Sequence, residues 1–119
     1  MKVDQMGKEF KTITKDINQY IKELHKEIPD VVDAFSTMAK AATADNVLDK
    51  KTKELVALAL GVSSHCDACL GFHTQALARL GATRAEVAEV LGMAVYMGGG
   101  PSMMYAADAL RAFDEASEK

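Results

Sequence analysis

Both cysteines and two of the three histidines of the chain lie within nine residues, in the segment HCDACLGFH from His65 to His73. Cys66 and Cys69 are separated by two residues, a spacing that would place their Cβ atoms ~5–6 Å apart on a helix. A small adjustment of one helical turn would then allow a disulfide to form. Because a bridge across so short a loop adds little stability, the pair is better suited to a reversible redox switch than to a structural staple.

Helix position and a neighbouring histidine would both favour the reactive form of these thiols. A cysteine in the first turn of a helix faces free backbone N–H groups and the positive end of the helix dipole, which stabilise a thiolate. By this criterion the thiolate is favoured most at Cys66. His73 follows Cys69 by four residues, on the same helical face, where it could exchange a proton with that thiol.

Glu54 precedes Cys66 by twelve residues and lies at the edge of the apolar run LVALALGV. A carboxyl group buried there and facing the dithiol would be a candidate proton shuttle, whereas in an exposed KKTKE turn it would be an ordinary surface charge. Zinc is an alternative occupant, because Cys66, Cys69 and His73 with His65 or Glu54 could supply four ligands. Structural zinc sites usually add a second close pair of ligands, and the chain has no other cysteine, so neither a metal nor a cofactor is expected.

Helices are expected to position these residues. The first segment has apolar residues at steps of three and four, which predicts one stripe of an amphipathic helix. The stripe comprises Met6, Phe10, Ile13, Ile17, Tyr20, Leu24 and Ile28. Pro29 ends this helix and opens the next, PDVVDAFSTMAKAA. Asp49 is a plausible N-cap for KKTKELVALALGVSS, whose increasingly apolar end predicts burial.

The remaining helices are bounded by recognisable start and stop signals. The quoted segment begins a fourth helix that runs to about Leu80, with Gly81 as its C-terminal stop. The sequence TRAE fits a capping box that opens RAEVAEVLGMAVYM, and GGGP breaks that helix and begins SMMYAADALRAFDEAS. No alternating strand pattern is present. The sequence therefore predicts an all-α fold of about six helices in a single domain, residues 1–119.

A group of methionines and tyrosines near the end of the chain has two interpretations. Methionine at helical spacing usually fills irregular gaps in a core, which is the first expectation here. The alternative is a subunit interface, where Met and Tyr are enriched. The residues concerned are Met93, Tyr96, Met97, Met103, Met104 and Tyr105.

Composition limits the classes of function. The 119 residues are 49% hydrophobic, enough for a core at this length, and 14 basic against 17 acidic side chains give a net charge of −3. This scattered and slightly acidic balance argues against binding nucleic acid. The polar N-terminus and the short apolar runs predict neither a signal peptide nor a membrane segment, so a cytoplasmic location is expected. In that reducing compartment a pair of cysteines is more often catalytic, redox-active or metal-binding than permanently bridged.

The pattern E-x11-C-x2-C-x3-H formed by Glu54, Cys66, Cys69 and His73 resembles the alkylhydroperoxidase D-like (AhpD-like) branch of the carboxymuconolactone decarboxylase family. The flanking sequence from Lys51 to about Gly99 is also similar. The resemblance implies an all-helical fold that assembles as a homotrimer or homohexamer. It further implies reduction of a peroxide substrate, with the thiols restored by an external dithiol on a lipoyl-bearing or thioredoxin-like protein.

The resemblance also implies a role for each residue. Cys69 would attack the peroxide as a thiolate and become a sulfenic acid, and Cys66 would resolve it as an intramolecular disulfide. Glu54 and His73 would form the proton relay. The best-characterised peroxidases of this type carry a histidine where this chain has Ala68, so dithiol redox activity is better supported than efficient peroxide reduction.

Two other functions compete with the peroxidase. Decarboxylation of a carboxylated muconolactone, the reaction in the family's name, needs cationic groups for two carboxylates, and after the cysteines no arginine occurs before Arg79. The second is a non-enzymatic helical oligomer whose cysteines sense redox state or bind a partner. Disulfide formation without turnover of any hydroperoxide would favour that sensor.

Overall fold

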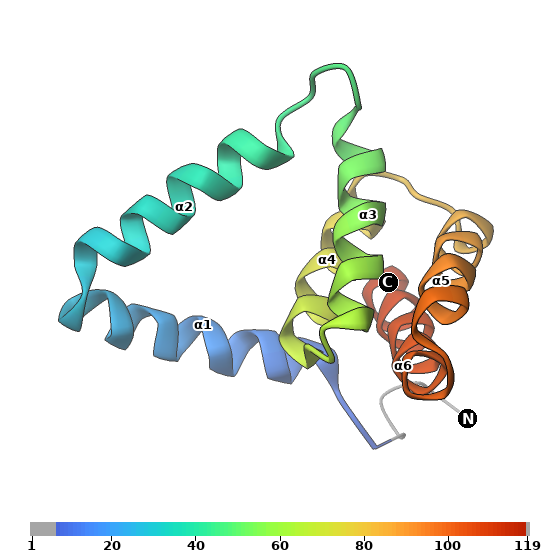
Figure 1. Cartoon of the computed structure of the whole chain (residues 1–119). Coiled ribbons are helices and arrows are strands. Elements are labelled where there is room, and N and C mark those ends of the chain that lie inside the picture. Colours follow the sequence, from blue (N-terminus) through green and yellow to red (C-terminus); the bar gives the residue numbers. More distant parts are fainter. Residues whose placement is uncertain (1–6, 119) are drawn as a thin grey trace.

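The computed structural model describes residues 7–118, which form six α-helices and no strand (Figure 1). The helices are α1 (Phe10–Glu27), α2 (Pro29–Thr43), α3 (Lys50–Ser63), α4 (Asp67–Arg79), α5 (Arg84–Gly98) and α6 (Gly100–Ser117). The all-α prediction is therefore confirmed, and the helix boundaries lie close to the expected ones. Met6 of the predicted stripe lies outside the described residues.

Local capping and stop signals explain where several helices begin and end. The Asp49 carboxylate accepts a hydrogen bond from the N–H of Thr52 at 2.7 Å, which caps α3. Thr83 and Glu86 form the predicted capping box at the start of α5. Gly81 follows the end of α4 with a φ of +79°, a left-handed conformation that glycine adopts without a steric penalty.

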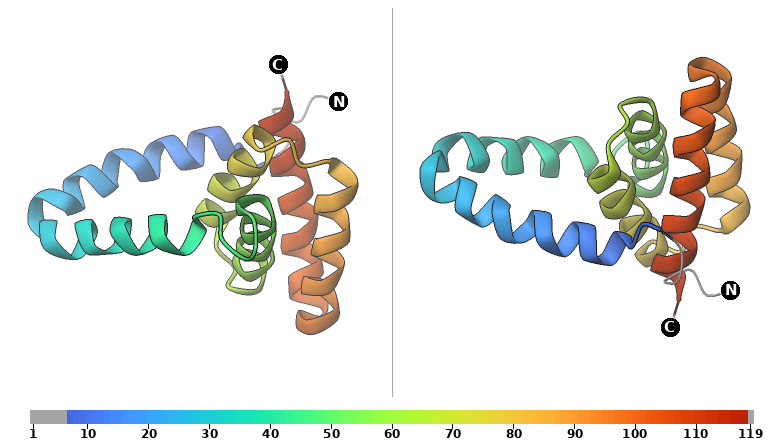
Figure 2. Two further views of the ribbon diagram at one scale, coloured as in Figure 1. Left: turned by 90° about the horizontal axis from the view of Figure 1, so that it is seen from above. Right: turned by 90° about the horizontal axis from the view of Figure 1, so that it is seen from below.

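The core lies among α3, α4, α5 and α6. Figure 2 shows α5 and α6 side by side, with α3 and α4 packed against them. The fully buried side chains of this core come from all four helices, and their packing fixes α3 and α4 relative to one another. They include Leu58, Val62, Leu70, Leu77, Val87, Ala109 and Ala112.

The first turn of α1 is fastened to this core by a carboxylate from the other end of the chain. Glu115 of α6 is buried, and its two oxygens accept hydrogen bonds from the N–H groups of Phe10 at 2.9 Å and Lys11 at 2.7 Å. The N-cap residue of α1, Glu9, makes no side-chain cap of its own. A residue of α6 therefore supplies the acceptor that the start of α1 would otherwise lack.

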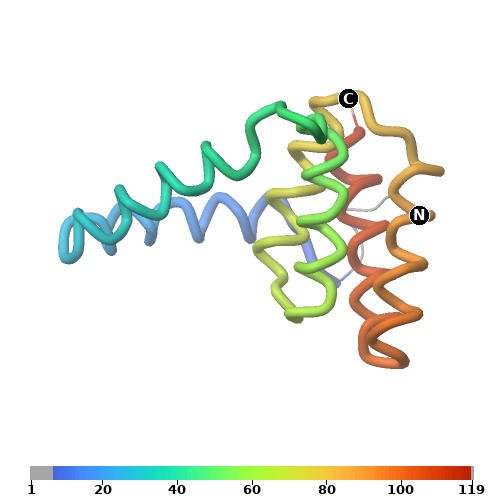
Figure 3. The backbone as a smooth tube through the Cα atoms, turned by 45° about the horizontal axis from the view of Figure 1, so that its top comes forward, coloured from blue at the N-terminus to red at the C-terminus, as the bar shows by residue number. Residues whose placement is uncertain are grey.

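Beyond its first turns, α1 pairs with α2 to form a hairpin that extends away from the other helices (Figure 3). No residue of α2 is buried, and the apolar stripe of α1 is exposed from Ile17 onward. The apolar part of α3 is buried on one face, at Leu58 and Val62 as predicted, whereas Val56 and Leu60 on the other face are exposed. Within residues 7–118, no helix combines the length and apolar character required to cross a membrane.

The expectation that the C-terminal methionines fill the core is wrong. Met93, Met97, Met103 and Met104 are each at least half exposed, as is Tyr96. The core positions of α5 and α6 are instead occupied by Val87, Leu91 and Phe113 together with four alanines, whose small side chains allow the two helices to pack closely. The alternative interpretation, a contact with another subunit, stays a prediction.

Candidate dithiol site

The turn between α3 and α4 places the first cysteine at the start of α4, as the sequence predicts. Cys66 is the N-cap of α4, and its N–H donates a hydrogen bond to the carbonyl of Gly61 at 3.1 Å. Its sulfur accepts a hydrogen bond from the N–H of Cys69 at 3.2 Å. One of the free N–H groups of the helix start is thus directed at the Cys66 sulfur, where it would stabilise negative charge.

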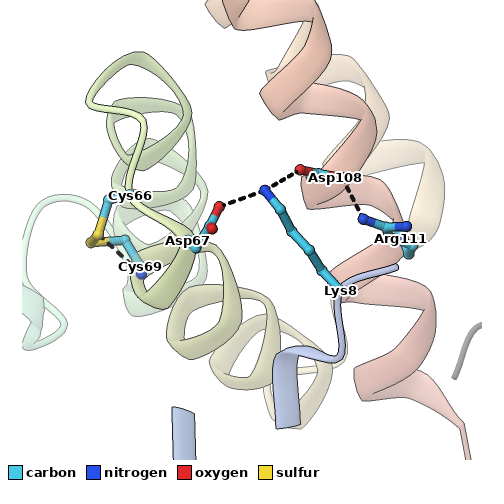
Figure 4. A network of polar contacts seen from close by, with 6 residues as sticks. All are labelled: Lys8, Cys66, Asp67, Cys69, Asp108 and Arg111. Carbon is cyan, nitrogen blue, oxygen red and sulfur yellow. Dashed lines mark hydrogen bonds and ion pairs between the residues drawn. A yellow bond between two sulfur atoms is a disulfide. The ribbon is translucent and has the colours of Figure 1, made fainter. Parts of the chain in front are cut away.

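Cys66 and Cys69 are joined by a disulfide in the first turn of α4, with their Cα atoms 5.2 Å apart (Figure 4). This separation is ordinary for a disulfide and matches neighbouring positions on one helical turn. Both residues are partly exposed. The disulfide therefore lies in a partly exposed turn, where an external reductant could approach the bond.

Glu54 and His73 form a second pair beside the disulfide. His73 lies one turn after Cys69 on α4, and its Nδ1 is hydrogen-bonded to Oε2 of Glu54 at 2.6 Å. Glu54 is only 5% exposed, whereas the side chain of His73 is 30% exposed. When Nδ1–H donates to the carboxylate, Nε2 is the remaining ring nitrogen and can accept a hydrogen bond or a proton. Such an arrangement can relay protons between a buried carboxylate and the outside.

Gly61 is a residue of the site that the sequence analysis did not identify. A Cβ atom at this position would lie 3.1 Å from the Cβ of Cys69, closer than ordinary van der Waals contact. The glycine therefore allows α3 to approach the disulfide turn of α4. Its only signal in the sequence is a glycine inside an otherwise apolar helix.

His65 takes no part in the dithiol pair or the carboxylate pair. Its φ is +54°, and its ring stacks on Tyr105 of α6, with ring centroids 4.6 Å apart and ring planes 7° from parallel. This contact directs the histidine towards α6. Among residues 7–118, no group of three or more His, Cys, Asp or Glu side chains is arranged to hold a metal ion.

A network of charges on the other side of the turn was also not anticipated from the sequence. Figure 4 shows Lys8, which precedes α1, between Asp67 of α4 and Asp108 of α6, with Arg111 beyond. The pKa of Lys8 is raised above its ordinary value, chiefly because its ammonium group donates a hydrogen bond to Asp108. Burial lowers this pKa, and Asp67 raises it further. Asp67 lies between the two cysteines, so the network adjoins the dithiol.

Comparisons with known proteins point to one family. A sequence profile of the carboxymuconolactone decarboxylase family matches residues 29–112. An uncharacterised protein of Cupriavidus necator is 44% identical over 109 residues, which cover 92% of this chain and 96% of that protein. An uncharacterised protein from the cox locus of Paracoccus denitrificans is 36% identical over 83 residues, or 70% of this chain and 75% of that one.

A solved structure agrees with these sequence matches. It is the crystal structure of a carboxymuconolactone decarboxylase family protein from Legionella pneumophila in its apo form. The two structures superpose with a TM-score of 0.89 and share 58% sequence identity. The match covers 92% of this chain and 97% of the other, so it includes the helices that carry the dithiol site.

Replacement of Gly61 by alanine should destabilise the oxidised protein by about 1–2 kcal/mol, because overpacking against Cys69 outweighs the better helix propensity of alanine. Urea unfolding would measure the change. Gly92→Ala is the matched control, since Gly92 is helical and has nothing within 4 Å of its Cβ position. It should stabilise the protein by about 0.5–1 kcal/mol. An equal gain from both substitutions would contradict the close approach at Gly61.

Proposed function

Because the chain belongs to the carboxymuconolactone decarboxylase family, we propose that it is a dithiol–disulfide oxidoreductase that reduces a hydroperoxide. The observation that carries this proposal is the disulfide in the first turn of α4, with a part-buried glutamate–histidine pair beside it. A redox-active pair requires sulfurs that can reach one another without rearrangement of the fold, and it requires a proton carrier. Both requirements are met within α3 and α4.

The proposed reaction has three balanced steps. In the first, the Cys69 thiolate attacks one oxygen of the peroxide and the O–O bond breaks, giving a sulfenic acid at Cys69 and an alkoxide or hydroxide that takes a proton. In the second, the Cys66 thiolate attacks the sulfenic sulfur, forms the disulfide and releases water after proton transfer. In the third, an external dithiol, on a lipoyl-bearing or thioredoxin-like protein in a reducing cytoplasm, reduces the disulfide and becomes a disulfide itself.

The Glu54–His73 pair supplies the proton relay in this scheme. His73 accepts the proton of the Cys69 thiol and returns it to the leaving oxygen, and the Glu54 carboxylate stabilises the imidazolium that forms between these events. Ala68 occupies the position at which related peroxidases carry a further histidine. The proposed relay of this chain is therefore shorter by one group.

Hydrogen bonding at the turn supports different roles for the two sulfurs. The N–H of Cys69 donates to the sulfur of Cys66, and a sulfur that receives a hydrogen bond is the better leaving thiolate. An incoming reductant would then attack Cys69 and expel Cys66. The same atom of Cys69 would thus receive both the peroxide oxygen and the reductant.

Decarboxylation of a muconolactone and a purely sensory role remain the competing functions. Binding a lactone with two carboxylates requires cationic side chains that are not already paired. Lys8 lies near the dithiol but already contacts the carboxylates of Asp67 and Asp108. A sensor would use the same disulfide without turnover. The Glu54–His73 pair would serve either role, and only repeated turnover with a reductant separates an enzyme from a sensor.

We also propose that the protein is a homotrimer or homohexamer, with further copies of the chain covering the α1–α2 hairpin. A groove along α1 is lined by Ile17, Tyr20, Ile21 and Leu24, and Phe35 and Met38 of α2 are likewise exposed. Exposed apolar surface of this extent is unusual for a monomer and typical of subunit contacts.

Cys69→Ser should abolish consumption of a hydroperoxide driven by dihydrolipoamide, because no sulfenic acid can form at the attacking position. Cys66→Ser should instead allow one turnover and trap a sulfenic acid at Cys69, detected as a mass increase of one oxygen. In the parent protein, stoichiometric peroxide should remove both thiols and leave a mass two hydrogens lower. Undiminished peroxide turnover by Cys69→Ser would contradict the assignment of Cys69 as the attacking residue. Lactone turnover by a variant with both Cys66→Ser and Cys69→Ser would support decarboxylation.

Glu54→Gln should lower the rate of peroxide reduction by about 100-fold, because glutamine cannot stabilise the imidazolium of His73. Stopped-flow measurement of thiol loss in the reduced protein would isolate this step. Glu89→Gln is the control, since Glu89 is an exposed carboxylate on α5. Equal rates in the two variants would remove Glu54 from the relay.

Light scattering should give a mass of three or six times 12.8 kDa. Phe35→Asp should reduce the assembly to smaller species, because a buried unpaired carboxylate opposes association. Val47→Asp, at an exposed position in the turn between α2 and α3, is the control and should leave the mass unchanged. A monomeric parent protein would contradict the proposed assembly.

A further inference from the structure

Four charged side chains form a neutral network beside the dithiol. The ammonium group of Lys8 is 3.0 Å from an Asp67 oxygen and 2.8 Å from an Asp108 oxygen, and Arg111 contacts the second oxygen of Asp108 at 2.6 Å. Two positive and two negative charges therefore cancel. The network joins the segment before α1 to α4 and α6 (Figure 4).

Lys8 is held near both neighbours of Cys66. It contacts Asp67, the residue after this cysteine, directly. Its ammonium group also lies 5.2 Å from the ring centroid of Tyr105, and that ring stacks on His65, the residue before the cysteine. A left-handed φ is unfavourable for a residue with a side chain, and the stack helps to hold His65 in that conformation. A contact of Lys8 with the segment around the dithiol is thus built into the fold.

The charge of Asp67 has a direct consequence for the thiols. A carboxylate next to Cys66 in the chain disfavours a thiolate in the same helical turn, because like charges repel. Lys8 cancels this charge, and the hydrogen bond to Asp108 raises the pKa of Lys8, so the ammonium group stays protonated where thiols ionise. No other cation contacts Asp67 among the described residues.

We propose that Lys8 is a positioning residue that acts through Asp67. By cancelling the charge of Asp67, it favours the thiolate form of the dithiol cysteines. The other titratable groups around the turn have partners of their own. Replacement of Lys8 therefore changes the charge near the thiols mainly through Asp67. His73 is bonded to Glu54 of α3, His65 stacks on Tyr105, and Asp108 keeps Arg111 as a partner when Lys8 is removed. The inference rests on the proposed function only in treating the reduced dithiol as a working state of the protein.

The test is the pH dependence of thiol alkylation in the reduced protein of 119 residues. The initial rate of reaction with iodoacetamide follows the thiolate fraction, so its midpoint reports the more acidic thiol. Lys8→Met should raise this midpoint by about half a pH unit or more and lower the rate below the midpoint about threefold. Lys8→Arg should keep the parent profile, and Lys15→Met, at an exposed position on α1, should have no effect.

Asp67→Asn separates charge from structure. It breaks the same ion pair as Lys8→Met but removes the negative charge, so the midpoint should move down instead of up. A contact that merely held the turn together would shift both variants in the same direction. An unchanged or higher midpoint for Asp67→Asn would overturn the proposal, as would a parent-like profile for Lys8→Met. Should Lys8→Met fail to fold, as judged by circular dichroism, Asp67→Asn still decides.

This experiment is independent of peroxide chemistry. Opposite shifts in a protein that turns over no hydroperoxide would uphold the role of Lys8 and remove the peroxidase. Peroxide turnover combined with unshifted midpoints would support the peroxidase and overturn the role of Lys8.

Discussion

The candidate site depends on how α3 and α4 pack against one another. The two helices are antiparallel, and Gly61 allows close approach opposite Cys69. Seven residues earlier on α3, about 10 Å along its axis, Glu54 lies on the same face, while His73 lies only about 6 Å beyond Cys69 on α4. The glutamate side chain is long enough to span the remaining distance of about 4 Å along the helix axes. Its carboxylate thereby reaches His73 and forms the 2.6 Å hydrogen bond. A single helix contact thus positions both the sulfurs and the Glu54–His73 pair.

The chain buries two glutamates, and their partners distinguish their roles. Glu115 accepts hydrogen bonds from two backbone N–H groups at the start of α1, which satisfies the carboxylate with donors that cannot lose a proton. Glu54 is bonded instead to the imidazole ring of His73, an ionisable side chain. Burying a carboxylate against an ionisable side chain contributes little to stability, because the cost of desolvation offsets the attraction. The Glu54–His73 pair lies one helical turn from the disulfide, a position that suits the proton transfer proposed for it.

The helices divide into a part that supports the site and a part that does not. The helices from α3 to α6 enclose the core, and the dithiol lies in the turn that begins α4. Helix α1 is joined to them mainly at its first turn, through Phe10, Thr14 and Glu115, and α2 buries no side chain. The apolar face of the hairpin is therefore free to meet another chain, while the turn at Cys66 is fixed within one.

The sequence by itself determined the helices and the chemistry of the central segment, because both depend on residues close together in the chain. Asp49 and Gly81 cap and stop their helices locally, and two cysteines three residues apart can meet in one turn wherever that turn lies. Which faces are buried was decided only by tertiary packing, and the methionines of α5 and α6, expected in the core, are exposed. The partners of Glu54 and Lys8 also depend on packing: 19 residues separate Glu54 from His73, and 100 separate Lys8 from Asp108. No local pattern encodes such contacts, since they form only when distant helices share a core.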